Sequence, residues 1–176
     1  MLVVSNYKSF VGDIVIAVKE DKIVGLWIGK QRDSLSLIKE EMISNDNDVT
    51  IVKTKKWLDR YFNNEKPDIN ELPLNLLGTE FQLLVWNILK EIPYGEVISY
   101  KEIADRIAKI KKIKKMSAQA VGGAVHRNPI SIIIPCHRVI GYNGNLTGYA
   151  GGIDIKVSLL KHEGIDMKIL YLPKNK

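Results

Sequence analysis

The chain has 176 residues and a formal net charge of +6 at pH 7, with one cysteine and three histidines. It has no run of about twenty apolar residues and no secretory signal at its start, so we expect neither a transmembrane helix nor export. A single cysteine cannot form an internal disulfide, which fits a reducing, cytoplasmic environment, and the cysteine and histidines lack the spacing of a zinc site. We therefore expect no metal and no membrane contact.

The first half of the chain has the pattern of β-strands followed by helices. Residues 13–18 and 22–28 are runs rich in β-branched side chains, and the three residues between them predict a hairpin. After the hairpin the pattern predicts, in chain order, helices at about residues 33–43 and 51–62, a loop at 63–68, and a linker with one extended piece at 71–78.

Helix-capping residues organise the second half. Thr79 with Gln82, and Ser99 with Glu102, have the form of capping boxes. The first of these helices should end at residues 93–95, and a third helix should run from Ser117 to about residue 127. The second and third form a plausible helix-turn-helix.

The predicted fold class is α/β, with two domains. Residues 1–75 form a small N-terminal β-sheet with helices, and residues 76–176 form a mainly helical C-terminal domain. The first segment carries 11 basic and 12 acidic side chains, a net charge of −1, whereas the second carries 15 and 8, a net charge of +7. A basic domain favours a polyanionic partner, although charge also serves solubility.

Cys136, the only cysteine, follows a run of three isoleucines and is itself followed by His137 and Arg138. A thiol reacts as its thiolate, and a free cysteine has a pKa of roughly 8.5, so a nucleophilic cysteine needs a base or a positive environment. A packed core cysteine is the alternative, but the neighbouring residues favour chemistry.

Residues 128–141, which contain this cysteine, resemble the active-site signature of the O6-alkylguanine-DNA alkyltransferases. Four further segments are similar to motifs of this family and occur in the same order: residues 97–104, 120–124, 148–152 and 159–164. The resemblance covers about residues 79–163 and is only loose in the N-terminal half. It implies direct reversal of DNA damage, in which the protein flips O6-alkylguanine out of double-stranded DNA and moves the alkyl group irreversibly to its own cysteine. No cofactor is needed for this reaction, and we expect a monomer.

The resemblance also implies roles for individual residues. Cys136 matches the nucleophile, His137 the histidine that takes the thiol proton through a water, and Glu163 the glutamate that orients this histidine. Asn128 matches the asparagine that ties the active-site turn to the recognition helix, and Tyr100 matches the tyrosine that donates to the leaving guanine. The residues expected to contact the flipped base are Val125, Val139, Tyr149 and Ala150.

The third predicted helix is rich in small residues, and each glycine weakens a helix by roughly 1 kcal/mol relative to alanine. The resemblance implies that this helix lies in the minor groove of DNA, and close helix packing is the alternative explanation. The residues expected to contact DNA are Gln119, Ala120, Gly122, Gly123, Arg127, Lys111, Lys112, Lys114 and Lys115. The lysines belong to the segment 109–115, which either contacts phosphates or is a solvated extension of a helix.

One residue departs from the family pattern. Gln119 stands where the family commonly has an arginine that intercalates in place of the flipped base, so we predict weaker or more salt-sensitive DNA binding. Two other functions remain open. A helix-turn-helix module that only binds DNA or lesions would need no reactive thiol, whereas a cysteine hydrolase would turn over repeatedly on an ester or amide.

Overall fold

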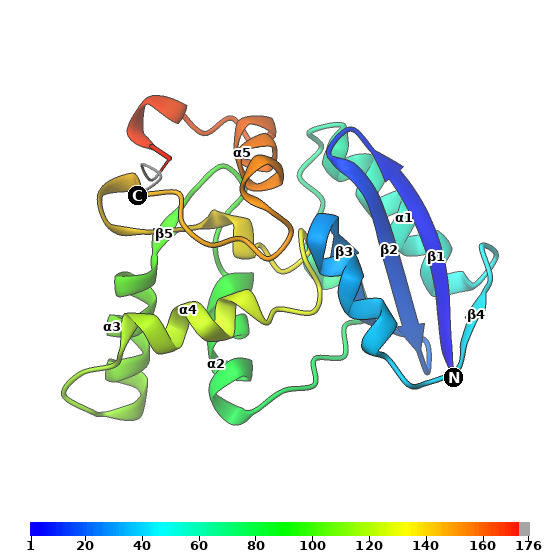
Figure 1. Ribbon diagram of the computed structural model, residues 1–176, viewed down its shortest axis with the longest axis horizontal. Coiled ribbons are helices and arrows are strands. Elements are labelled where there is room, and N and C mark those ends of the chain that lie inside the picture. The colour runs from blue at the N-terminus through cyan, green and yellow to red at the C-terminus, as the bar shows by residue number, and fades with distance from the viewer. Residues whose placement is uncertain (173–176) are drawn as a thin grey trace. The chain divides into compact units, whose positions relative to one another are not determined.

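The computed structural model describes residues 1–172, and it divides the chain into two compact units. Unit 1 contains residues 1–77 together with 129–133, and unit 2 contains residues 78–128 and the chain from residue 134 onward. The expected α/β architecture is confirmed, because unit 1 is a sheet with helices and unit 2 is mainly helical (Figure 1). No helix in the described part of the chain has the length and hydropathy needed to span a membrane.

Unit 1 is built on a four-stranded sheet with the order β3-β2-β1-β4. Its strands are β1 (Leu2–Ser9), β2 (Gly12–Lys19), β3 (Lys22–Ile28) and β4 (Met42–Ser44). The predicted hairpin is confirmed, and both Glu20 and Asp21 at its turn have positive φ, as the preferred two-residue hairpin turns require. The helix α1 (Val49–Phe62) packs against β1 and β2 (Figure 1), and the Asp48 side chain caps its first turn.

The helix predicted at residues 33–43 is wrong. The structure has instead a 3₁₀ helix, η1 (Gly29–Leu37), and then the short strand β4, which pairs in parallel with β1. Two causes account for this difference. The Ser36 hydroxyl bonds the backbone carbonyl of Asp33, a local bond that competes with helical pairing, and the apolar Leu37 is 78 % exposed, so no buried stripe stabilises a helix.

Unit 1 also receives a segment from much later in the chain. The Leu26 N–H donates to the carbonyl of Pro129 at 2.9 Å, and the Ser131 N–H donates to the carbonyl of Leu26 at 3.0 Å. The Ser131 hydroxyl also bonds the side chain of Gln31 inside the unit at 2.7 Å. A division by sequence position alone would leave residues 129–133 with the C-terminal domain, but these long-range bonds place them beside β3.

Unit 2 contains the helices α2 (Glu80–Lys90), α3 (Tyr100–Lys111), α4 (Ala118–His126) and α5 (Ile153–His162). Both predicted capping boxes are present, and Ser117 caps α4 through the Ala120 N–H. The sequence did not predict the two short parallel strands β5 (Ile98–Ser99) and β6 (Val139–Ile140), which are too short to show a period. Shorter 3₁₀ turns complete the two units: η2 (Ile69–Glu71), η3 (Cys136–Arg138), η4 (Tyr142–Gly144) and η5 (Met167–Ile169).

The lysine-rich segment 109–115 is partly helix and partly loop. Its first three residues are the last turn of α3, and Lys112 then ends the helix in a left-handed conformation with φ 54° and ψ 41°. The Ile113 N–H reaches back to the carbonyl of Ala108, as in a Schellman cap. Glycine is the usual residue at such a position because a side chain there is strained.

Replacing Lys112 with glycine should therefore raise the free energy of unfolding by about 0.5–1 kcal/mol, because glycine adopts the left-handed conformation without strain. The matched variant Lys111→Gly removes the same charge from the last helical residue and should lower the free energy of unfolding by roughly 1 kcal/mol. Urea denaturation followed by circular dichroism measures both values. An equal effect at the two positions would contradict a left-handed cap at Lys112.

Candidate active site

Cys136 lies at the start of the 3₁₀ turn η3 and is 4 % exposed. The residue before it, Pro135, has φ −81° and ψ 65°, and the Cys136 N–H donates to the carbonyl of Ile134 at 2.8 Å. This is the geometry of an inverse γ-turn, which is common at the starts of loops. The tight turn and the proline ring together fix the backbone that carries the thiol.

Backbone strain occurs four residues before the cysteine, within unit 1. Ile132 has φ 70° although it is β-branched, and the Ile133 N–H donates to the carbonyl of Ser131 across it at 2.8 Å. Such a conformation costs of order 1–3 kcal/mol, and it persists only where the surroundings hold it. Here the side chain of Ile132 is 1 % exposed, so burial in the core of the unit offsets the strain.

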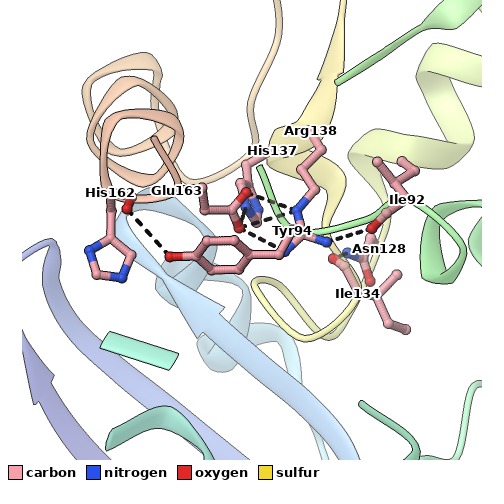
Figure 2. Close-up of polar contacts among 8 residues, drawn as sticks. All are labelled: Ile92, Tyr94, Asn128, Ile134, His137, Arg138, His162 and Glu163. Carbon is pink, nitrogen blue, oxygen red and sulfur yellow. Dashed lines mark hydrogen bonds and ion pairs between the residues drawn. The ribbon is translucent and has the colours of Figure 1, made fainter. Parts of the chain in front are cut away.

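Asn128 connects the end of α4 to the turn that holds the cysteine. Its backbone N–H donates to the carbonyl of Val125 at the end of the helix, and its side-chain amide donates to the carbonyl of Ile134 at 2.8 Å (Figure 2). The side chain is buried, so both bonds are shielded from water. Asn128 therefore ends the helix and also holds the carbonyl that closes the turn before Cys136.

Glu163, at the C-terminal end of α5, accepts hydrogen bonds from two neighbours of the cysteine. Nε2 of His137 lies 2.8 Å from Oε1 of Glu163, and the Arg138 guanidinium contacts both carboxylate oxygens at 2.7–3.1 Å. Figure 2 shows the carboxylate between the imidazole and the guanidinium. Arg138 also donates to the carbonyl of Ile92 at 2.6 Å, and its guanidinium lies over the ring of Tyr94.

These contacts set the charge states of the cluster. Burial raises the pKa of Glu163, but the His137 and Arg138 contacts outweigh it and hold the pKa well below its ordinary value, so the carboxylate is ionised. Burial lowers the pKa of His137 by more than Glu163 raises it, so the imidazole is neutral. An ionised carboxylate only accepts, hence Nε2 carries the hydrogen and Nδ1 keeps its lone pair. In the described residues Nδ1 is buried without a hydrogen-bond partner, so it is the ring nitrogen that can accept a proton.

Tyr100 is the first residue of α3. Its hydroxyl lies 3.3 Å from the carbonyls of both Thr147 and Gly148, in the loop that the sequence motif placed at the base pocket. Burial, and after it the negative charge of a Cys136 thiolate, raise the pKa of Tyr100 to about 12. The phenol is therefore a proton donor at neutral pH, within electrostatic range of the sulfur.

The structure also brings a lysine into the site that the sequence did not single out. Lys156 is fully buried, and its ammonium donates to the carbonyl of Val139 at 2.5 Å and to that of Thr147 at 3.3 Å. Burial lowers its pKa to about 8, and the charge of Cys136 opposes this shift. The Lys156 side chain thus connects β6, the strand that follows the cysteine turn, to the loop residue Thr147, whose carbonyl also contacts Tyr100.

A sequence signal existed for Lys156, and for the buried role of Arg138, which was considered only as a neighbour of Cys136. Lys156 occupies the apolar stripe of α5 that contains Leu159 and Leu160, where a charged side chain is unusual. Arg138 directly follows the Cys-His pair in a run of buried residues and is itself only 8 % exposed. In both cases a charge at a core position was the clue to a buried partner.

The remaining predicted residues belong to unit 2 and form two groups, one mostly buried and one mostly exposed. Val125, Val139 and Tyr149 are buried, and Ala150 is partly buried in the loop after Tyr149. On α4, Val121, Ala124 and Val125 face the interior, whereas the opposite face is exposed apart from Gly122, which is partly covered. The exposed residues predicted to contact DNA are Gln119, Ala120, Gly123, Arg127, Lys111, Lys112, Lys114 and Lys115. Residues 1–172 contain no cluster of three or more side chains suited to a metal ion.

Replacing Glu163 with glutamine should lower the free energy of unfolding at pH 7 by about 3–5 kcal/mol, because it leaves the buried Arg138 without its counter-charge. The folded pKa of Glu163 lies below the ordinary value of 4.5, so its stabilising contribution is complete above that value and is lost as the pH falls toward the folded pKa. The difference between the wild type and this variant should therefore shrink below pH 4.5.

Urea denaturation at a series of pH values measures this difference. Glu91→Gln is the matched control, because Glu91 is 70 % exposed and its contact with Arg106 is long at 3.9 Å. A difference between wild type and Glu163→Gln that stays constant from neutral to acid pH would contradict the ionised state of Glu163.

Known proteins are similar to this chain over most of its length. Two family models match the chain: "6-O-methylguanine DNA methyltransferase, ribonuclease-like domain" over residues 2–76, and "6-O-methylguanine DNA methyltransferase, DNA binding domain" over residues 80–165. A methylated-DNA–protein-cysteine methyltransferase of Methanosarcina acetivorans is 44 % identical over 160 residues, which are 90 % of this chain and 96 % of that protein. The constitutive enzyme of the same name from Bacillus subtilis is 41 % identical, over 89 % of this chain and 92 % of its own.

Solved structures with a similar fold include a complex with DNA. Mycobacterium tuberculosis OGT in complex with DNA has a TM-score of 0.78 at 37 % identity, with 92 % of each chain covered. An O6-methylguanine DNA methyltransferase from Methanococcus jannaschii has a TM-score of 0.64 at 29 % identity, with 98 % of this chain and 99 % of that chain covered. Together with the two family models and the curated relatives, these similarities show that the chain belongs to the methylated-DNA–protein-cysteine methyltransferase family.

Proposed function

We propose that the chain repairs O6-alkylguanine in double-stranded DNA by transferring the alkyl group to Cys136, once per molecule. The observation that carries this proposal is the state of the side chains beside the sulfur. A neutral His137 has its Nε2 hydrogen directed at an ionised Glu163, and the lone pair on Nδ1 is left to accept a proton. This is the nucleophile-base-orienter arrangement that activates a cysteine.

The reaction begins with loss of the thiol proton from Cys136, which passes through a water to Nδ1 of His137. The imidazolium that forms is stabilised by the carboxylate of Glu163. The thiolate then attacks the alkyl carbon in line with its bond to O6. A sulfur–carbon bond forms, the carbon–oxygen bond breaks, and the electron pair of that bond moves to the guanine.

The leaving guanine receives a proton as its negative charge develops. Tyr100 is suited to this step, because its phenol keeps its hydrogen at neutral pH and lies near the sulfur. A positioned donor lowers the barrier where charge develops in the transition state. Buried Val125, Val139 and Tyr149 shape the pocket for the base, and the backbone N–H of Ala150 donates to O6. The proton held by His137 then returns through water to the Tyr100 phenolate, and the products are an S-alkylated protein and normal guanine, so no cofactor is needed.

DNA binding relies on the exposed face of α4 and on the positive charge of unit 2. Ala120, Gly122 and Gly123 have a small side chain or none, so the backbone of α4 can approach the minor groove closely. Arg127 and the exposed lysines contact phosphates. Gln119 lies at the site where the flipped base leaves the stack. Extrusion costs a few kcal/mol, which these contacts must supply. We infer that the chain acts as a monomer, because one chain contains every group that the reaction uses, and that it acts in the cytoplasm, where its single cysteine stays reduced.

Intact-protein mass spectrometry tests the reaction. After mixing with a duplex that carries one O6-methylguanine, the wild type should gain one methyl group per chain, and Cys136→Ser should gain none. Transfer that is absent from the wild type, while lesion DNA still binds, would favour a module that only recognises damage. Repeated turnover on an ester or amide would favour a cysteine hydrolase.

The DNA contacts are tested by the salt dependence of binding. Gln119→Arg should strengthen binding to lesion duplex, whereas alanine at Lys111, Lys112, Lys114 and Lys115 should weaken it. Each lost phosphate contact should reduce the slope of log K against log salt by roughly 0.9. A control that removes four exposed lysines of unit 1, Lys8, Lys22, Lys53 and Lys56, loses the same charge elsewhere. Unchanged affinity in both test variants would refute these roles.

A further inference from the structure

A cavity of about 510 Å³ opens on unit 2 beside the proposed DNA-binding helix. One side of it is formed by α3 and α4, where Tyr100, Gln119 and His126 line it. The segment between β6 and α5 contributes the other lining residues: Gly141, Tyr142, Thr147 and Gly148. Its volume lies within the range of pockets that hold small organic groups. Cys136 does not line this cavity, whereas Tyr100 and Gly148 do, so the cavity adjoins the proposed base pocket.

Tyr142 is the most exposed aromatic residue in the described chain, at 79 %, and it stands on the rim of this cavity. A single exposed aromatic side chain is ordinary on a protein surface. Here, however, the ring lies at the mouth of a cavity that Gln119 and Gly122 line from the opposite side. Within residues 1–172 the ring has no hydrogen-bond or aromatic stacking partner, and its 79 % exposure leaves it accessible to a ligand.

The backbone beneath Tyr142 is held firmly. Tyr142 opens the 3₁₀ turn η4, and the N–H of Gly141 donates to the carbonyl of Asn145 at 2.7 Å to close the loop. Gly144 has φ 86°, and a Cβ there would lie 2.0 Å from the carbonyl oxygen of Ile169, so only glycine allows this close approach. The ring is thus presented on a fixed support, which reduces the ordering cost of binding.

We propose that Tyr142 stacks on a nucleobase next to the extruded nucleotide of lesion-bearing DNA. This inference rests on the proposed function and adds a residue that the DNA contacts above do not include. A base that loses its neighbour by flipping exposes a π-face, and aromatic side chains bind such faces without regard to sequence. Gln119, on the opposite side of the cavity, has no ring and cannot replace the lost stacking. Because the ring is 79 % exposed, whereas Val125, Val139 and Tyr149 of the proposed base pocket are buried, it meets the flanking base and not the alkylated one.

The test measures affinity for a duplex with one O6-methylguanine, in a Cys136→Ser background so that the lesion is not consumed. Tyr142→Ala should weaken binding roughly 5-fold to 150-fold, the range expected for one lost stacking contact. Tyr142→Phe should bind like its parent, because the ring and not the hydroxyl makes the contact. The slope of log K against log salt should not change, since no charge is lost. Tyr171→Ala is the matched control, because Tyr171 is also exposed, at 49 %, but does not line the cavity.

A fluorescent base reports the contact directly. With 2-aminopurine next to the lesion, the complex with Tyr142→Ala should be brighter than the complex with its parent, because the ring no longer quenches the base. Unchanged affinity and unchanged fluorescence in Tyr142→Ala would overturn the inference. Slower transfer from the free base O6-methylguanine to Tyr142→Ala, with Cys136 restored, would place the ring on the alkylated base and would also overturn it.

Failure of this inference can be told apart from failure of the proposed function. Wild-type protein that gains a methyl group, beside a Tyr142→Ala variant that binds as its parent does, removes only the role of Tyr142. Wild-type protein that gains no methyl group removes the transfer reaction, and the stacking role falls with it.

Discussion

The carboxylate of Glu163 is the interaction on which the rest of the active site depends. It is buried, it bonds both His137 and Arg138, and those two residues directly follow the cysteine. A charge in such a place is costly unless its partners are fixed, so the α5 terminus, the η3 turn and the end of α2 must all be in place together. This one contact sets the tautomer of His137, and therefore leaves Nδ1 as the ring nitrogen that can accept a proton.

Local chemistry explains what could be predicted from the sequence. The boxes at Thr79 and Ser99 form within four residues, the hairpin before residue 28 depends on its own turn, and the signature around Cys136 is a short continuous stretch of sequence. Such features need no knowledge of distant residues. They predicted most helices of unit 2 and singled out Cys136 as the candidate nucleophile.

The features that were missed depend on contacts between residues far apart in the chain. The pairing of β4 with β1 replaces a helix whose apolar residues had no surface to pack against, and β6 pairs with β5 across about forty residues. The burial of Lys156 is explained only by the folded structure, in which its ammonium donates to the carbonyls of Val139 and Thr147. A local pattern records the charge at such a position but not the groups that satisfy it.

The segment 129–133 has a consequence for how the protein is made. Because its bonds to Leu26 complete unit 1, that unit is not encoded by one continuous stretch. N-terminal domains usually fold first during synthesis, but here the part of β3 around Leu26 stays an unpaired edge until the ribosome has also released α2, α3 and α4. The first unit therefore cannot be completed until three helices of the second have been synthesised, and a nascent chain that stalls before residue 129 carries an open strand edge, which is prone to aggregation.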